Sequence, residues 1–317
     1  MRHEGFWLTA GDATELFINR WCGDAPLKGV VMISHGMAEH SLRYARFAEA
    51  LTAQGFQVYA LDQRGHGKTA ERGTVGHYAD NDGWQKVVSD LALLNHHIRS
   101  THPQAPIFLF AHSMGSYIAQ AYLMQHSCSL QGAVLSGSNY GDPLTFKAGR
   151  LIAQFERWRQ GNTGRSKLLD FLSFGSFNKA FKPNRTAFDW LSRDPSEVDK
   201  YVNDPLCGFL CSNQLWVDLL GGLVTITSVP ALSTIDADLP VLVIGGERDP
   251  VSDGKRLSTL AEKLREAGLN SVQLNIYPQA RHELLNETNR ADVTHEVINW
   301  LEAHLTHARV CTPKEMA

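Results

Sequence analysis

Ser113 stands at the boundary between two contrasting patterns in the chain. Residues 107–111 form a short apolar run, and small residues with helical periodicity begin directly after the serine. A strand that turns sharply into a helix would lift a serine hydroxyl clear of the sheet edge. The turn requires small flanking residues, and Ala111 and Gly115 meet this requirement, although the consensus has glycine at the first position. The pattern predicts that Ser113 is a nucleophile.

A serine hydroxyl becomes reactive when a histidine accepts its proton and an acid orients that histidine. In sheet hydrolases with such a turn, the acid and then the histidine follow the serine along the chain. Asp249 comes just after the apolar run 240–246, and His282 lies in the loop after the run 272–277. The chain has 14 histidines, so the position of His282 carries the argument. We predict a Ser113–Asp249–His282 triad; the plainer interpretation of Asp249 is a turn aspartate.

Acyl transfer also needs two N–H donors directed at the oxygen that becomes negative. Met114, the residue after the serine, is the first candidate. The second is Met37, in the loop that follows the apolar run ending at residue 34 and begins His35-Gly36. A His-Gly start is typical of oxyanion loops, with the glycine allowing close backbone approach. Glu39 could brace this loop or be a surface carboxylate.

Strand and helix patterns alternate along most of the chain, which places these loops at one edge of a sheet. Two alternating segments, Phe6–Thr9 and Glu15–Trp21, predict an antiparallel hairpin. Continuous apolar runs then alternate with helical patterns, as expected for a parallel sheet covered by helices on both faces. The runs are 29–34, 56–62, 107–111, 132–136, 240–246 and 272–277, and the helical patterns lie near 41–54, 83–101, 114–127, 253–267 and 290–307.

The alternation stops between residues 137 and 235, which are rich in aromatic residues and lack a convincing β-rich run. We predict an α/β core made of residues 1–136 and 236–317, with a helical cap inserted at 137–235. Ordinary helix packing accounts for most of the aromatic residues. A few would suffice to make the cap a lid over an apolar pocket.

Bulk properties exclude several classes of function. The net charge is −3 without a basic block, so nothing suggests nucleic-acid binding. No apolar stretch is long enough for a membrane span. No spacing of His and Cys resembles a metal site, and no glycine-rich nucleotide motif occurs, so no metal or cofactor is expected. The five cysteines are odd in number, and no apolar leader opens the chain, so we expect reduced thiols and a cytoplasmic protein.

Four motifs resemble a known family: the loop from His35 to Tyr44, Asp62-Gln-Arg-Gly-His-Gly67, His112-Ser-Met-Gly115 and Glu247-Arg-Asp-Pro-Val251. They are similar to the monoacylglycerol lipase and lysophospholipase-like α/β-hydrolases, which are grouped with the serine aminopeptidases (S33). The resemblance implies an eight-stranded, mostly parallel sheet, a helical cap and no cofactor. It also implies the triad and oxyanion roles assigned above.

The leading interpretation is a serine hydrolase that cleaves a carboxylic ester, such as a monoacylglycerol or a lysophospholipid. Peripheral contact between the cap and a membrane is compatible with this interpretation. An S33-type aminopeptidase with the same triad is the first alternative. It would need acidic cap residues to hold a substrate amine, and the four available ones form no obvious cluster in the sequence: Glu156, Asp170, Asp189 and Asp194. A ligand-binding homologue without catalysis is the second alternative. Acyl length, head group and oligomeric state cannot be read from the sequence.

Overall fold

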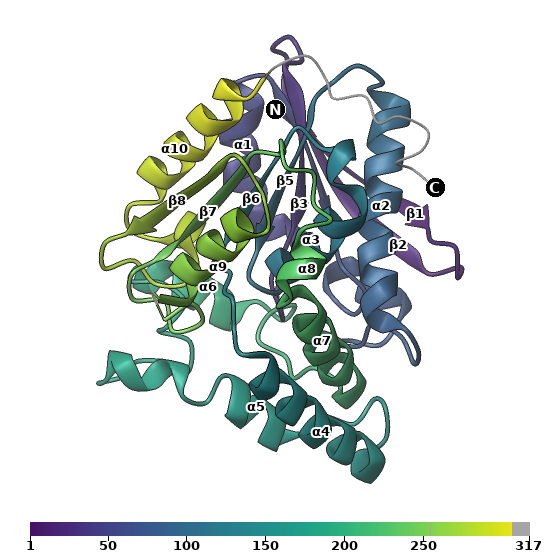
Figure 1. Cartoon of the computed structure of the whole chain (residues 1–317), viewed down its shortest axis with the longest axis vertical. Helices are drawn as coiled ribbons and strands as arrows, with labels where there is room; N and C mark the ends of the chain where they lie inside the picture. Colours follow the sequence, from purple (N-terminus) through teal and green to yellow (C-terminus); the bar gives the residue numbers. More distant parts are fainter. Residues whose placement is uncertain (254, 306–317) are drawn as a thin grey trace.

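The computed structural model describes residues 1–253 and 255–305, and its centre is an eight-stranded sheet (Figure 1). The strand order is β1-β2-β4-β3-β5-β6-β7-β8; β2 pairs antiparallel with both β1 and β4, and all other neighbouring strands are parallel. The mostly parallel α/β-hydrolase sheet is therefore confirmed. The strands are β1 (Arg2–Thr9), β2 (Glu15–Cys22), β3 (Gly29–Ser34), β4 (Phe56–Leu61), β5 (Ile107–His112), β6 (Gly132–Ser136), β7 (Val241–Gly246) and β8 (Val272–Tyr277).

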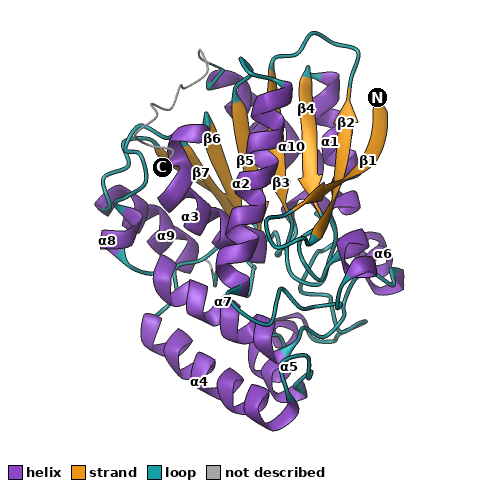
Figure 2. Ribbon diagram, turned by 90° about the vertical axis from the view of Figure 1, so that its right-hand side faces the viewer, coloured by secondary structure: helices purple, strands orange, loops and turns teal. Residues whose placement is uncertain are grey.

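Helices cover both faces of the sheet, as the continuous apolar strands require (Figure 2). Helices α1 (Ala45–Ala53) and α10 (Arg290–Ala303) pack on one face through side chains such as Leu51 and Val297. Helices α2 (Gly83–Thr101), α3 (Met114–His126) and α9 (Lys255–Glu266) pack on the other, with side chains such as Leu91. The two apolar layers hold the sheet rigidly between them.

The predicted strands and helices agree closely with these elements. The hairpin strand β1 is longer than predicted, and the pattern near 41–54 divides into a 3₁₀ turn, η1 (Ser41–Tyr44), followed by α1. The pattern near 253–267 gives α9, with residue 254 outside the described residues. Helix α10 ends before the predicted pattern does, and residues 306–307 of that pattern also lie outside them.

Residues 137–235 contain helices and no strand among the described residues, and they lie at the end of the sheet that carries the carboxyl ends of the parallel strands (Figure 1). Helices α4 and α7 pack against one another. Asp142 and Ser166 cap α4 and α5 through their side-chain oxygens. The elements are α4 (Pro143–Gln160), α5 (Lys167–Ser173), η4 (Phe177–Phe181), α6 (Pro195–Asn203), α7 (Asn213–Ile226) and α8 (Val229–Leu232).

The cysteines depart from expectation at one position. Cys22, Cys207 and Cys211 carry free thiols, but Cys128 is disulfide-bonded, so the expectation of reduced thiols fails there. Cys311 lies outside the described residues. No helix within residues 1–253 and 255–305 is both long and apolar enough to cross a bilayer.

Candidate active site

Ser113 occupies the sharp turn between β5 and α3. Its backbone has φ 51° and ψ −123°, a conformation that non-glycine residues rarely adopt. The Ser113 amide donates to the Ser136 carbonyl at 2.9 Å, which ties the turn to the neighbouring strand β6. A Cβ atom at Gly115 would lie 2.3 Å from the Ser34 carbonyl oxygen, so only glycine fits there. The strain of the turn is thus held by the surrounding strands.

Asp249 and His282 meet at the same edge of the sheet. The His282 Nδ1 atom lies 3.0 Å from the Asp249 Oδ2 atom, and both side chains are almost fully buried, at 2% and 1% exposure. The second oxygen, Oδ1, accepts the Val251 amide at 2.8 Å, which fixes the carboxylate plane. With Nδ1 donating to the carboxylate, Nε2 is the ring nitrogen that can accept a proton. Burial lowers the pKa of His282, but the Asp249 carboxylate outweighs it, so the pKa is raised overall.

Two further rings enclose His282, and sequence reasoning missed both. The His112 ring centroid lies 4.7 Å from that of His282, and the Trp190 ring centroid lies 5.1 Å away. Burial and the neighbouring His282 lower the pKa of His112 to about 4, so His112 is neutral near pH 7. The His282 amide also donates to the Trp190 carbonyl at 3.4 Å. The residue before the serine and a residue of the 137–235 segment therefore both position the histidine.

Met37 and Met114 both line the larger cavity at Ser113, and their backbone amides are available as donors. Met114 is the first residue of α3, where helix geometry leaves the amide without an intrahelical acceptor. Within the described part of the chain, neither the Met37 nor the Met114 amide donates to an acceptor. The Met114 sulfur accepts a hydrogen bond from the Tyr78 hydroxyl at 2.8 Å, which holds this side chain in place.

His35 and Gly36 shape the loop that carries Met37. The Gln63 amide donates to the His35 Nε2 atom at 3.0 Å, so Nδ1 carries the proton and donates to the Gly36 carbonyl at 2.8 Å. A Cβ atom at Gly36 would lie 3.2 Å from the Ser113 Cβ atom and 2.8 Å from a Glu39 oxygen. The glycine therefore lets the loop lie directly against the serine.

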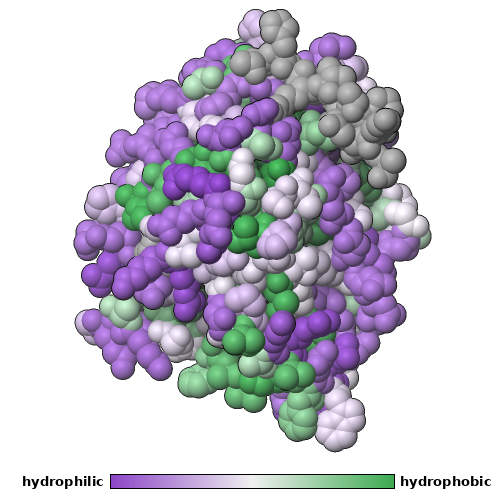
Figure 3. Space-filling view, in the orientation of Figure 1, coloured by the Kyte–Doolittle hydropathy of each residue, from purple (hydrophilic) through white to green (hydrophobic). Residues whose placement is uncertain are grey.

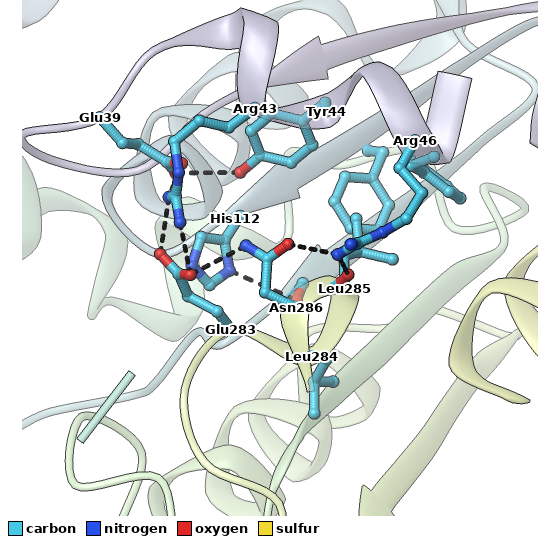
Figure 4. A pocket seen from close by; sticks show the side chains of 12 residues that line it. Glu39, Arg43, Tyr44, Arg46, His112, Glu283, Leu284, Leu285 and Asn286 are labelled. Carbon is cyan, nitrogen blue, oxygen red and sulfur yellow. Dashed lines mark hydrogen bonds and ion pairs between the residues drawn. The ribbon is translucent and has the colours of Figure 1, made fainter. Parts of the chain in front are cut away.

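Glu39 is buried and braces this loop, so the surface interpretation of this carboxylate is wrong. Its Oε1 atom accepts the Gly36 amide at 2.6 Å and the Tyr44 hydroxyl at 3.0 Å, and its Oε2 atom accepts from Arg43 at 2.5 Å (Figure 4). Burial raises the pKa of Glu39, but the Arg43 guanidinium, the nearby rings of His112 and His35 and the Gly36 amide together outweigh it and bring the pKa to about 2. Arg43 also donates to both oxygens of Glu283 at 2.7 Å. One guanidinium thus joins the loop of Met37 to the loop of His282.

Two cavities meet at the serine. The larger has a volume of about 910 Å³ and is mostly apolar, with Tyr117, Phe146 and Leu219 among its lining residues. The smaller, about 220 Å³, is also lined by His282. Ser113 lines both cavities, as do Met37 and Phe174.

Of the four acidic residues considered for amine binding, only Asp170 lines the small cavity. Glu156 pairs with Arg159, and Asp194 pairs with Arg290. Asp189 accepts the Thr186 hydroxyl and two backbone amides. The structure therefore does not bring these four carboxylates together.

One group of side chains could hold a metal ion: His40, Asp204 and Cys207, whose ligand atoms lie within 4.8 Å of one another. The His40 Nε2 and Asp204 Oδ2 atoms already form a hydrogen bond of 2.9 Å. Burial raises the pKa of the Cys207 thiol, which opposes the thiolate that a metal needs. This group links the loop of Met37 to the segment after α6.

Comparison with known proteins identifies the family of this chain. The family model described as serine aminopeptidase, S33, matches residues 25–289. A monoacylglycerol lipase from Mycolicibacterium smegmatis is 29% identical over 290 residues, covering 90% of this chain and 92% of the relative. The human monoglyceride lipase is 28% identical, with 96% and 93% covered.

Among solved structures, a thermostable carboxyl esterase from Bacillus coagulans has the same fold, with a TM-score of 0.89, 24% identity, and coverage of 96% of this chain and all of that one. The chain therefore belongs to the serine aminopeptidase S33 family of α/β-hydrolases, as a carboxylic ester hydrolase that resembles the monoacylglycerol lipases.

Proposed function

We propose that this enzyme cleaves monoacylglycerols or lysophospholipid-like acyl esters through a Ser113–His282–Asp249 triad. The observation that carries the proposal is the buried Asp249–His282 hydrogen bond beside a cavity that both His282 and Ser113 line. In this mechanism His282 Nε2 takes the Ser113 proton while the serine oxygen attacks the acyl carbonyl carbon. Asp249 keeps the imidazole in the required tautomer and stabilises its charged form.

The tetrahedral intermediate places a negative oxygen near the free amides of Met37 and Met114, which act as its donors. Collapse of the intermediate breaks the ester C–O bond, and His282 returns the proton to the departing alcohol. The acyl group is then bound to Ser113. A water molecule, deprotonated by His282, releases the free acid and restores the serine. No metal or cofactor takes part in these steps.

The two cavities match the two halves of an acyl ester. The 910 Å³ cavity, with its apolar walls, would take the acyl chain, since burying each methylene contributes about 0.8 kcal/mol. The 220 Å³ cavity would take the alcohol, which is the smaller half. On this proposal residues 137–235 form the cap that closes both cavities over the α/β core.

The decisive experiment is a panel of monoacylglycerols and simple acyl esters assayed with wild type and Ser113→Ala. We expect Ser113→Ala to remove ester turnover while the variant folds normally by circular dichroism. Ser100→Ala, on the exposed face of α2, is the matched control and should retain full activity. Cleavage of aminoacyl naphthylamides but not of esters would favour an aminopeptidase. Failure of a fluorophosphonate to label Ser113 would favour a ligand-binding protein.

We also propose peripheral membrane contact through α4 and α5. Apolar side chains gather at this end of the molecule (Figure 3), although a monomer normally buries such residues. Trp158 is 80% exposed and Leu144 72% exposed. The other exposed apolar residues of these helices are Leu151, Ile152, Phe155, Leu168, Phe171 and Leu172. Such a surface would bring the enzyme to the interface where lipid esters reside.

Sedimentation with neutral phosphatidylcholine vesicles tests the membrane contact. Wild type should co-sediment, and Trp158→Asp should not, while both should hydrolyse a water-soluble short-chain ester equally. Equal binding of the two proteins would disprove this contact. The three free thiols favour a cytoplasmic location and the disulfide of Cys128 opposes it, so cell fractionation decides the compartment.

A further inference from the structure

Phe174 lies at the junction of the two cavities that meet at the serine. Among the described residues, only Ser113, Met37 and Phe174 line both cavities. The serine side chain is too small to separate them. Met37 has a flexible, unbranched side chain that adapts to whatever lies next to it. Phe174 therefore supplies the rigid side chain at the junction.

Aromatic neighbours from both cavities surround the Phe174 ring. It stacks on the ring of Trp190, with centroids 6.0 Å apart and planes 19° apart, and Trp190 lines the small cavity. The Phe174 centroid also lies 5.7 Å from that of Phe177 and 5.8 Å from that of Trp216, and both of these rings line the large cavity. The ring contacts thus place Phe174 between the two cavities, independently of the cavity outlines.

The two tryptophans that hold this ring are themselves fixed. Trp190 is buried, and its carbonyl accepts the His282 amide. Trp216, on α7, is buried in the apolar layer that covers one face of the sheet. Phe174 packs against this layer and also against the smaller apolar cluster that contains Trp190. The Phe174 ring therefore cannot swing aside without losing contacts with both groups of side chains.

The position of His282 assigns the two halves of an ester to the two cavities. In acyl transfer the histidine returns its proton to the oxygen of the departing alcohol, so this oxygen must lie beside the imidazole. His282 lines the small cavity and is not among the described residues that line the large one. The alcohol would therefore occupy the small cavity, with Phe174 between it and the acyl chain.

We propose that Phe174 determines the specificity of this enzyme for the size of the alcohol, because its ring divides the alcohol cavity from the acyl cavity. The alcohol cavity has about 220 Å³ against about 910 Å³ for the acyl cavity. A compact alcohol such as glycerol would fit there, whereas a bulky alcohol would meet the ring. This inference rests on the proposed function, because it takes the two cavities to hold the two halves of an ester. The reaction steps are unchanged.

Two octanoate esters of primary alcohols test the proposal: ethyl octanoate and 1-naphthylmethyl octanoate. They share the acyl chain, so the acyl cavity is filled in the same way, and they differ in the size of the alcohol. Wild type should have a kcat/KM for the ethyl ester at least about tenfold above that for the naphthylmethyl ester, because a closed pocket wall discriminates by size to this extent.

Two variants identify Phe174 as the residue responsible. Phe174→Ala removes the ring and joins the cavities, so it should raise the naphthylmethyl-to-ethyl ratio of kcat/KM by about 10- to 100-fold. Phe174→Leu keeps part of the wall and should raise this ratio less. Val202→Ala, at an exposed position of α6 that lines neither cavity, is the control and should leave the ratio unchanged. A gain on the bulky ester is a result that a merely destabilised protein would not give.

The outcomes separate the two proposals. Hydrolysis of neither ester by wild type would overturn the proposed function. Equal hydrolysis of both esters by wild type, or a ratio that Phe174→Ala leaves unchanged, would overturn the dividing role of Phe174 and leave the ester hydrolase intact. Loss of activity toward both esters in both Phe174 variants would show that the ring is needed for turnover itself, and would also overturn its role in selecting the alcohol by size.

Discussion

Replacing Glu39 by glutamine tests whether the buried Glu39–Arg43–Glu283 network holds the active-site loops. The substitution keeps the shape of the side chain and removes its charge. Of its three hydrogen bonds, the one to the Gly36 amide at 2.6 Å is closest to Met37. Arg43 keeps its bidentate contact with Glu283, so the guanidinium is not left without a carboxylate. The loss should therefore be smaller than for a buried charge with no partner at all.

The magnitude follows from the pKa of the carboxyl group. Lowering the pKa of Glu39 from 4.5 to about 2 corresponds to roughly 3 kcal/mol of stabilisation of the charged form in the folded protein. A depressed pKa stabilises the fold fully above the unfolded value of 4.5, and this contribution is lost as the pH falls toward 2. We expect Glu39→Gln to lower the free energy of unfolding by about 2–4 kcal/mol at pH 7. About half of the pH-dependent part should be gone at pH 3.

Urea unfolding at pH 7 and pH 3 measures this difference, and steady-state kinetics measures the effect on catalysis. A displaced oxyanion donor should lower kcat by about 10- to 100-fold, less than the complete loss of a donor. Glu4→Gln is the control, because this exposed carboxylate also pairs with an arginine and should cost less than about 1 kcal/mol. An equal stability difference at both pH values, or an unchanged kcat, would refute the bracing role of Glu39.

The remaining predictions concern the triad and the turn. Asp249→Asn should lower kcat by about 10⁴-fold, because His282 loses the partner that sets its tautomer. In wild type, kcat/KM should rise with pH through an ionisation above 6.5, because the pKa of His282 is raised. Asp249→Asn should move this rise in kcat/KM to lower pH. A rise at the same pH in both proteins would contradict the assignment. Gly115→Ala should lower the melting temperature sharply, because the added Cβ atom would lie 2.3 and 2.5 Å from two backbone oxygens. Gly11→Ala, whose Cβ atom would have no atom within 4 Å, should leave the melting temperature nearly unchanged. Equal melting temperatures of the two variants would contradict the steric argument.

The strands and core helices could be predicted because each depends on a local pattern. Strands buried on both faces appear as continuous apolar runs, and β3 and β6 have the predicted bounds. The order of Ser113, Asp249 and His282 also follows from strand ends, which share one sheet edge. The sequence therefore predicts which residues approach one another at that edge, and the Asp249–His282 hydrogen bond agrees with this prediction.

Contacts between distant segments could not be predicted in the same way. Arg43 and Glu283 are 240 positions apart, and no local pattern connects them. The Glu39–Arg43 ion pair is easier to predict from the sequence, because its spacing of four residues is typical of helical ion pairs. Asp170 looked like any other acid of the 137–235 segment. Only the three-dimensional structure distinguishes it, by its position in the cavity beside Ser113.

The 137–235 segment is not uniform in its attachment to the core. Residues 189–193 are bonded along the loop of His282: the Glu283 amide donates to the Leu191 carbonyl at 2.8 Å, and Arg193 pairs with the fully buried Glu287 at 2.7 Å. Separating them would leave the Glu287 carboxylate buried without its cation, at a cost of about 3–5 kcal/mol. Trp190, which packs on His282, belongs to this attached part. It is therefore a wall of the active site. Most of the exposed apolar residues of the 137–235 segment lie instead on α4 and α5, which form no ion pair with that loop among the residues described. Substrate entry through the apolar end would leave the histidine and its supports in place.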